Sequence, residues 1–334
     1  MTQNRYSRQM LYRNIGEEGQ AKISQKSALI VGMGALGTHV SEGLVRAGIG
    51  KIIIIDRDYI EHSNLQRQTL FTEKDADESI PKVIAAERAL RDIRQDVTIE
   101  AFIDHVDAAF LAQYVPEVDV VIDATDNFET RMLINDAAYY YQKPWIYGGV
   151  VQSTYVEAAF IPGETPCFQC LVPQIPSMNL TCDTVGVIQP AVTMTTSLQI
   201  RDALKILTET AFTPKLTYGD IWEGTHYTFG FTKLYNPQCS TCGETPTYPY
   251  LNEQAPRFAS MCGRESVQYQ HPTLDQHQLL EYLQSRDIPY RSNDYLIQFK
   301  FDGYRFVGFQ NGRILIHGLN DVKQAQTMIH KLFG

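Results

Sequence analysis

The chain has 334 residues, of which 44% are hydrophobic and 20% are charged. These proportions are typical of a folded globular protein and exclude disordered, collagen-like and coiled-coil classes. Acidic residues outnumber basic ones by 38 to 29, giving a net charge of −9, which argues against a nucleic-acid or anionic-membrane partner, since both need a positive surface. No apolar run approaches the length of a membrane span, and no signal peptide is expected. We therefore expect a cytoplasmic protein.

The first part of the chain alternates between predicted strands and predicted helices. Apolar strands are expected at 28–32, 51–56, 97–103, 119–124 and 145–151, and helices at 36–48, 82–92, 107–114 and 128–141. Apolar strands joined through helices are typical of parallel βαβ units whose sheet is covered on both faces.

Beyond this alternation, the residues at 154–160 predict an antiparallel strand. One long helix is expected at 190–209 and one more strand at 226–235. The predicted fold class is therefore α/β, with a Rossmann-like, doubly wound and mostly parallel sheet that is extended by antiparallel strands.

A stretch with three prolines and little periodicity precedes a small C-terminal unit. In this unit, Asp302-Gly303 and Asn311-Gly312 are expected as tight turns between strands. The helices are expected at 274–285 and 320–332, and the strands at 295–301, 304–310 and 313–317. The predicted division is a larger domain at 1–243, a linker at 244–270 and a small α+β domain at 271–334. The role of the last domain is open between partner docking, flanking of a dimer and passive stabilisation.

A glycine motif, GMGALG at residues 32–37, joins the first predicted strand to the first predicted helix. Glycines let the backbone turn tightly and approach a phosphate, and the helix N-terminus presents unpaired N–H groups. Asp56 ends the next strand, where a carboxylate accepts hydrogen bonds from a ribose diol. These features predict a nucleotide site, and a turn that only packs helix on strand is the alternative. A P-loop is excluded, because Thr38 and His39 stand where it needs Lys and Ser or Thr.

Basic side chains follow the strand that ends at Asp56. The segment Ser63 to Arg67 comes shortly after it, and Lys82 opens the next predicted helix. Arginine grips phosphate oxygens through a planar fork, and lysine supplies a point charge. A dehydrogenase needs no pair of cations at this position, whereas a site that binds a triphosphate does. For each of these cations taken singly, the alternative to phosphate binding is an ordinary solvated charge on the surface.

Two carboxylates end the fourth predicted strand, in the segment Asp123-Ala124-Thr125-Asp126-Asn127. Ligands of doubly wound sheets bind at this edge. Asp126 is expected to hold Mg²⁺ beside the phosphates, since hard carboxylate oxygens suit that ion. Asp123 is expected to form local hydrogen bonds.

Two Cys-x-x-Cys pairs, Cys167 with Cys170 and Cys239 with Cys242, lie far apart in the sequence. Four thiolates supply a closed tetrahedral site for Zn²⁺, which leaves no position open for water. The predicted zinc is therefore structural. A thioredoxin-like dithiol is the alternative, but it uses one such motif at a helix N-terminus, whereas both pairs here lie in turn-rich segments.

In their joint order these features resemble the ubiquitin-activating-enzyme-like superfamily, in its bacterial HesA/MoeB/ThiF branch, which includes the adenylyltransferases for molybdopterin synthase and for the thiamine sulfur carrier. The resemblance covers residues 5–243, and its pieces are Arg5, Tyr6, Ser7, Arg8, Gln9, the glycine motif, Asp56, Ser63 to Arg67, Lys82, Asp126, Asn127, Cys182 and both cysteine pairs.

The resemblance implies an ATP site, with Mg²⁺ on Asp126 and a homodimer in which Arg8 reaches the triphosphate of the partner subunit. The implied ATP-binding residues are Gly32, Gly34, Ala35, Gly37, Asp56, Ser63, Asn64, Leu65, Gln66, Arg67, Lys82, Asp126 and Asn127. Ala35 stands where many relatives have glycine.

The implied reaction is adenylation of the C-terminal Gly-Gly carboxylate of a small β-grasp sulfur-carrier protein. The carboxylate attacks the α-phosphate and pyrophosphate leaves, while Arg8, Arg67, Lys82 and Mg²⁺ neutralise charge. No general base is needed, because the carboxylate is ionised at neutral pH. The expected carrier is the molybdopterin synthase small subunit, and the thiamine sulfur carrier is the alternative. A cysteine desulfurase or another sulfur donor is considered as a further partner.

Three points remain open. Cys182 aligns with a cysteine that some relatives use for a covalent carrier intermediate, and an ordinary free thiol is the alternative. An NAD-dependent oxidoreductase would use the glycine motif and Asp56, but it leaves Arg67, Lys82 and the cysteine pairs without a purpose. A non-catalytic zinc-bearing scaffold would not need the complete set of charged residues.

Overall fold

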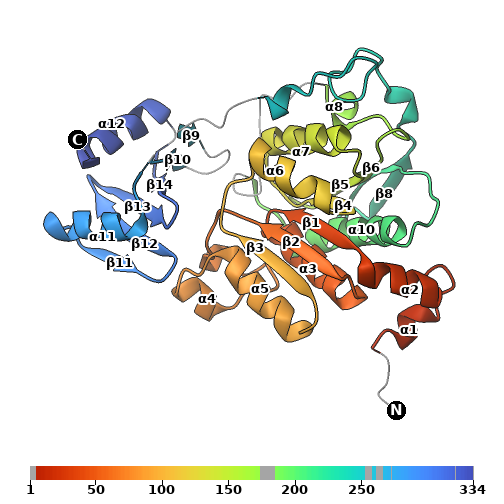
Figure 1. Cartoon of the computed structure of the whole chain (residues 1–334), viewed down its shortest axis with the longest axis horizontal. Coiled ribbons are helices and arrows are strands. Elements are labelled where there is room, and N and C mark those ends of the chain that lie inside the picture. Colours follow the sequence, from red (N-terminus) through yellow and green to blue (C-terminus); the bar gives the residue numbers. More distant parts are fainter. Residues whose placement is uncertain are drawn as a thin grey trace. The chain divides into compact units, whose positions relative to one another are not determined.

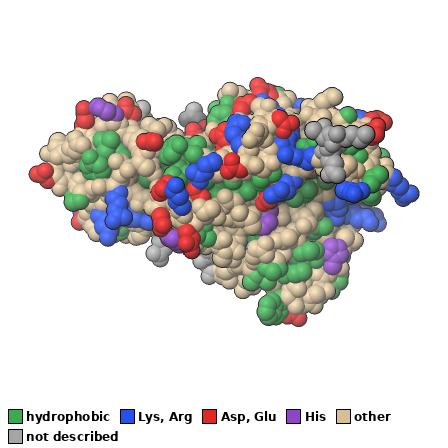
Figure 2. Space-filling view, turned by 90° about the horizontal axis from the view of Figure 1, so that it is seen from below, with side chains coloured by type: hydrophobic (Ala, Val, Ile, Leu, Met, Phe, Trp, Pro, Cys, Tyr) green, Lys and Arg blue, Asp and Glu red, His purple; other side chains and the backbone are tan. Residues whose placement is uncertain are grey.

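A computed structural model describes residues 5–173, 185–252, 258–260, 266–271, 273–319 and 321–333. The chain divides into two compact units, Met1–Glu253 and Gln254–Gly334, which are taken separately below (Figure 1). Within these described ranges, no helix is both long enough and apolar enough to cross a membrane. On the face that Figure 2 shows, acidic and basic side chains are interspersed.

The N-terminal unit is built on a sheet whose described strands run in the order β3-β2-β1-β4-β5-β6-β7-β8. The strands are β1 Ser27–Val31, β2 Lys51–Ile55, β3 Thr98–Phe102, β4 Val120–Asp123, β5 Trp145–Val151, β6 Thr154–Phe160, β7 Leu216–Asp220 and β8 Thr225–Phe229. Strands β1 to β5 pair in parallel, and β6, β7 and β8 extend the sheet in antiparallel pairing. The predicted α/β class is confirmed.

Helices cover both faces of this sheet (Figure 1). They are α1 Ser7–Met10, α2 Gly16–Gln25, α3 Ala35–Ala47, α4 Glu73–Asp77, α5 Lys82–Ile93, α6 Ala108–Tyr114, α7 Phe128–Tyr140, α8 Phe168–Leu171 and α10 Gln189–Leu207. Helices α6, α7 and α8 join one apolar cluster with side chains of β1, β2, β4, β5 and β6. On the other side, α3 packs against α5 and α10. Strands β1 and β4 are buried along their whole length, which explains their continuous apolar sequences.

The strand predicted at 226–235 corresponds to β8, which ends earlier, at Phe229, and the strand β7 that pairs with it was not predicted. Four of the five residues of β8 are exposed, so this strand shows no burial-driven alternation of apolar and polar residues. Strand β7 contains Gly219 and Asp220, two residue types that are depleted in strands. The sequence signal for both strands was therefore weak.

The C-terminal unit is an antiparallel sheet whose described strands run in the order β11-β12-β13-β14-β10-β9. Its elements are β9 Phe258–Ser260, β10 Ser266–Gln270, α11 Gln276–Ser285, β11 Tyr290–Ser292, β12 Leu296–Phe301, β13 Tyr304–Phe309, β14 Arg313–His317 and α12 Val322–Phe333. One face of the sheet forms an apolar cluster with both helices. Asp302 and Gly303 have φ of +50° and +84°, as expected for a type I′ turn. Strands β9 and β10 lie within the range 244–270 that was expected to be a linker.

Candidate functional site

The glycine turn lies against the carboxyl end of β4. Gly32 has φ of +95°, and a Cβ there would stand 2.6 Å from the Ala124 carbonyl oxygen. A Cβ on Gly37 would collide with the Gly32 carbonyl oxygen. Helix α3 starts directly after Gly34. Close approach of backbone to backbone therefore requires glycine at both positions, and the first amides of α3 face the edge at which ligands of such sheets bind.

Asp56, directly after β2, is fixed beside this turn. One carboxylate oxygen accepts a hydrogen bond from the Met33 N–H at 2.6 Å, and the other accepts one from the Asp58 N–H at 2.7 Å. Each oxygen keeps a lone pair for a further donor. The carboxylate is thus oriented by the backbone and still able to accept hydrogen bonds from a ribose.

Lys82 opens α5 and is almost completely buried, at 2% exposure. Its Nζ lies 3.4 Å from Asp58 Oδ2, and its N–H donates to the Asp58 carbonyl oxygen at 3.0 Å. Asp58 was not singled out from the sequence, although its position two residues after Asp56 places it at the same strand end. The ion pair fixes the lysine beside Asp58, two residues after Asp56.

The segment 62–68 lies next to the glycine turn at Gln68. Buried Asn64 accepts a hydrogen bond from the Glu61 N–H at 3.1 Å. The Arg67 guanidinium donates to the Ser63 carbonyl oxygen at 2.8 Å. The amide nitrogen of buried Gln68 would stand 3.8 Å from a Cβ on Gly34. Among the remaining predicted residues here, Ser63 and Gln66 are exposed and Leu65 is half-buried.

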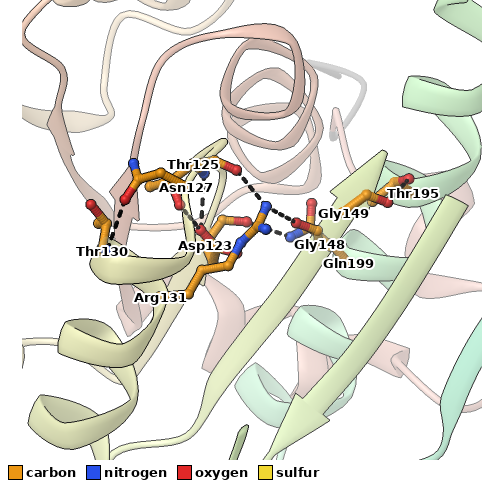
Figure 3. A network of polar contacts seen from close by, with 9 residues as sticks. All are labelled: Asp123, Thr125, Asn127, Thr130, Arg131, Gly148, Gly149, Thr195 and Gln199. Atoms are coloured by element: carbon orange, nitrogen blue, oxygen red, sulfur yellow. Dashed lines mark hydrogen bonds and ion pairs between the residues drawn. The ribbon is translucent and has the colours of Figure 1, made fainter. Parts of the chain in front are cut away.

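The loop after β4 carries the carboxylate predicted to bind Mg²⁺. Asp126 is exposed, whereas Asp123 is completely buried. Asn127 caps α7 by accepting a hydrogen bond from the Thr130 N–H at 2.8 Å (Figure 3). Burial raises the pKa of Asp123, while Arg131 and Thr125 act to lower it. Mg²⁺ is usually bound by one or two carboxylates together with substrate phosphates and water, so one exposed carboxylate at this edge fits that ion.

The four cysteines of the two pairs come together in the structure. Their Sγ atoms all lie within 4.8 Å of one another. Cys167 and Cys239 are 3.5 Å apart at sulfur, as are Cys170 and Cys242. A tetrahedral thiolate site with Zn–S bonds of about 2.3 Å places its sulfurs about 3.8 Å apart. The donor set and its spacing therefore fit a zinc ion.

Polar side chains around the cysteines connect this cluster to α7. Gln169 accepts hydrogen bonds from Ser240 at 2.8 Å and from Thr241 at 3.1 Å. Asp136, on α7, accepts from the Thr241 hydroxyl at 2.5 Å and from the Tyr250 N–H at 2.9 Å. These contacts hold the two halves of the cluster together independently of a metal.

Two predicted residues are not part of this assembly. Arg8 is exposed on α1, and its action on another subunit stays a prediction. Cys182 lies outside the described residues. The glycine turn, Asp56, Lys82 and the Asp126 loop, by contrast, converge on one sheet edge through the contacts given above.

The chain is similar to known proteins over most of its length. The model of the ThiF family matches residues 6–241. Sulfur carrier protein ThiS adenylyltransferase of Bacillus subtilis is 41% identical over 334 residues, covering 99% of both chains. A sulfur carrier protein adenylyltransferase of Thermus thermophilus is 33% identical, over 78% of this chain and 96% of its own. Among solved structures, Escherichia coli MccB with ATP has a TM-score of 0.62 and 26% identity, over 72% of this chain and 75% of its own.

Proposed function

Since the chain belongs to the ThiF family, we propose that it is an ATP- and Mg²⁺-dependent adenylyltransferase for a small sulfur-carrier protein. The observation that supports this most strongly is the end-to-end similarity to a Bacillus subtilis protein of that named activity. The sheet edge provides the matching parts, namely a glycine turn at a helix N-terminus, a ribose-type carboxylate, a buried lysine and an exposed carboxylate.

For the carrier, we propose the thiamine-pathway protein ThiS rather than the molybdopterin synthase small subunit. This reverses the expectation from the sequence, in which the molybdopterin carrier came first and the thiamine carrier was the alternative. Two relatives named as ThiS adenylyltransferases support this, the Bacillus subtilis protein and an Escherichia coli protein that is 36% identical over 61% of this chain. The molybdopterin carrier was expected from the overall resemblance of the adenylating core, and none of the motif residues named for the ATP site distinguishes the two carriers.

In the proposed reaction, a carboxylate oxygen of the carrier C-terminus attacks the α-phosphorus of ATP. The bond from that phosphorus to the bridging oxygen breaks, and pyrophosphate leaves with both electrons of the bond. Asp56 orients the ribose, the α3 amides and Lys82 and Arg67 hold the phosphates, and no proton is transferred. Mg²⁺, held by Asp126, would supply further neutralisation of phosphate charge.

The other predicted site residues take supporting roles in this proposal. Gly34, Ala35 and Gly37 shape the turn, and Ser63, Asn64, Leu65, Gln66 and Asn127 frame the nucleotide. Arg8 acts across a homodimer, and Zn²⁺ on the four cysteines is structural. Every one of these residues precedes 244, so adenylation itself is assigned to the N-terminal unit. Cys182 and the sulfur donor belong to later steps of sulfur transfer.

The experiment that tests this function is ATP–pyrophosphate exchange with purified carriers. We expect exchange that depends on ThiS and on Mg²⁺, with a lower kcat/KM for the molybdopterin carrier. A ThiS that lacks its last two glycines is the matched control and should support none. Exchange without any carrier, or binding of NAD in place of ATP by calorimetry, would overturn the proposal.

A further inference from the structure

A buried ion pair lies beneath the Asp126 loop. Asp123 is the last residue of β4 and is completely buried, and Arg131 on α7 is 6% exposed. Arg131 Nε donates to Asp123 Oδ2 at 3.0 Å (Figure 3). Neither charge of this pair faces the solvent, where a ligand would meet it.

The same arginine binds the loop backbone. Its Nη2 donates to the Thr125 carbonyl oxygen at 2.7 Å and to the Gly148 carbonyl oxygen at 3.2 Å. Thr125 in turn donates to Asp123 Oδ1 through its N–H at 2.9 Å and through its hydroxyl at 2.6 Å. The residue before Asp126 is therefore bound through its amide, its side chain and its carbonyl group. Because Asn127 is fixed as the cap of α7, Asp126 stands between two anchored neighbours.

Two further elements brace this network. Gln199, completely buried on α10, donates to the Asp123 carbonyl oxygen at 2.7 Å. A Cβ on Gly148 would collide with the Gln199 amide, so the glycine makes room for it. The Arg131 guanidinium also lies 5.0 Å from the ring centre of Tyr147. Strands β4 and β5 and helices α7 and α10 thus all contribute contacts to Arg131 or to Asp123 (Figure 3).

We propose that Arg131 is a positioning residue, which sets the place of the Asp126 carboxylate and thereby the affinity for the metal–ATP complex without touching the nucleotide. This rests on the proposed function, in which Asp126 binds Mg²⁺. Only a planar fork can reach the Asp123 carboxylate and two carbonyl oxygens at once, so lysine is not an equivalent replacement. Arg131 binds Asp123 and two backbone carbonyl oxygens and contacts no phosphate in this proposal, so its role differs from the phosphate-binding role proposed for Lys82 and Arg67.

The test is electron paramagnetic resonance titration of Mn²⁺ with the full chain and a non-hydrolysable ATP analogue. Arg131→Lys should weaken Mn²⁺ binding by about 10- to 100-fold, as is usual for a residue that orients a metal ligand. In the exchange assay it should raise the Mg²⁺ concentration for half-maximal rate, and saturating Mg²⁺ should restore much of kcat. Thr125→Val, which removes only the hydroxyl donor to Asp123, is the milder second variant and should shift the same two quantities less.

Arg94→Lys is the matched control. Arg94 is 5% exposed and donates to the Ile49 carbonyl oxygen at 2.6 Å, near the amino ends of the strands. The Arg94→Lys variant should have a lower melting temperature than the wild type and an unchanged affinity for Mn²⁺. Wild-type Mn²⁺ affinity in both Arg131→Lys and Thr125→Val, or an equal loss in Arg94→Lys, would overturn the positioning role while the proposed function stands. A wild-type chain that binds no Mn²⁺ with the analogue would overturn both.

Discussion

Lys82 and Asp58 form an ion pair at 3.4 Å in which the lysine side chain is 3% exposed and the aspartate side chain 13%. A triphosphate that binds Lys82 therefore meets a cation that already has a carboxylate partner. Breaking a buried pair from one side leaves an uncompensated charge, which costs about 3–5 kcal/mol of stability. Lys82 thus has a structural role and a proposed phosphate-binding role, and the two can be separated by mutation.

Lys82→Met should lose both stability and exchange activity. The double variant Lys82→Met with Asp58→Asn removes both charges, so we expect it to regain most of the free energy of unfolding measured with urea. Exchange should stay reduced by on the order of 10²-fold or more in both variants, as for loss of a donor that stabilises developing charge. If the double variant recovers exchange activity together with stability, the role of Lys82 is limited to the ion pair with Asp58.

Cys239→Ser should remove the zinc and destabilise the protein. Structural zinc sites release roughly 10–16 kcal/mol of apparent binding free energy in peptides, and the loss here should be smaller, because the large apolar core and the contacts of Asp136 and Gln169 persist. Metal analysis and thermal unfolding measure the two effects. Cys262→Ser, outside both pairs, is the control and should keep its zinc. A wild-type chain that contains no zinc and in which the thiols of Cys167, Cys170, Cys239 and Cys242 all react would refute the assignment.

Arg8→Ala and Asp126→Ala should each be inactive alone and active when mixed. In a mixed dimer one site combines the intact Asp126 of one subunit with the intact arginine of the other. Random exchange makes half of the dimers mixed, so about one quarter of wild-type activity is expected. Lys82→Ala mixed with Asp126→Ala is the control, since both residues act within one chain and no site is complete. If subunits exchange and the first mixture stays inactive, Arg8 does not act across an interface.

Glu157 on β6 should make stability fall as pH rises. Burial, and then the neighbouring Asp202, raise the pKa of this carboxyl well above its ordinary value. The folded state therefore binds this proton more tightly than the unfolded state, and its contribution to stability is lost as pH rises from the ordinary carboxyl range through the raised pKa. Glu157→Gln imitates the protonated form. Urea unfolding between about pH 5 and pH 8 should show a smaller decline for this variant than for the wild type.

Asp202→Asn serves as the contrast for Glu157→Gln. Burial acts to raise the pKa of Asp202, but Arg201 and Lys205 outweigh it and the pKa is lowered. Asp202 thus stabilises the fold above the ordinary carboxyl pKa, and its replacement should reduce stability at neutral pH. Equal declines for Glu157→Gln and the wild type between these pH values would show that Glu157 is already ionised in the folded protein.

Local patterns made much of the N-terminal unit predictable. The glycine motif, the Asp126 segment and the cysteine pairs are each short runs in which residue type and spacing carry the chemistry, and buried parallel strands appear as continuous apolar runs. The end of β8 was misplaced because this exposed strand carries no alternation, and β7 was missed because it ends in Gly219 and Asp220. Strand β10 was also missed. Its residues Val267 and Tyr269 alternate with polar residues, but the strand directly follows residues of irregular composition.

The residues that support the site were not predictable in the same way. Asp58, Arg131 and Gln199 are polar side chains on buried faces, and their partners come from other elements. Gln199 is separated from Asp123 by 76 positions, and Lys82 from Asp58 by 24. A single sequence gives the residue type at such a position but not the carbonyl or carboxylate that folding brings to it, so only the three-dimensional contacts reveal these roles.

The most direct test of the central claim is the mass of the ThiS carrier itself. After incubation with the enzyme, ATP, Mg²⁺ and inorganic pyrophosphatase, the reaction is quenched in acid and the intact carrier is weighed by mass spectrometry. We expect a carrier heavier by one adenylyl group, absent with Asp126→Ala and absent for a carrier without its terminal glycines. An unchanged carrier mass, with a folded enzyme that binds ATP, would contradict the account.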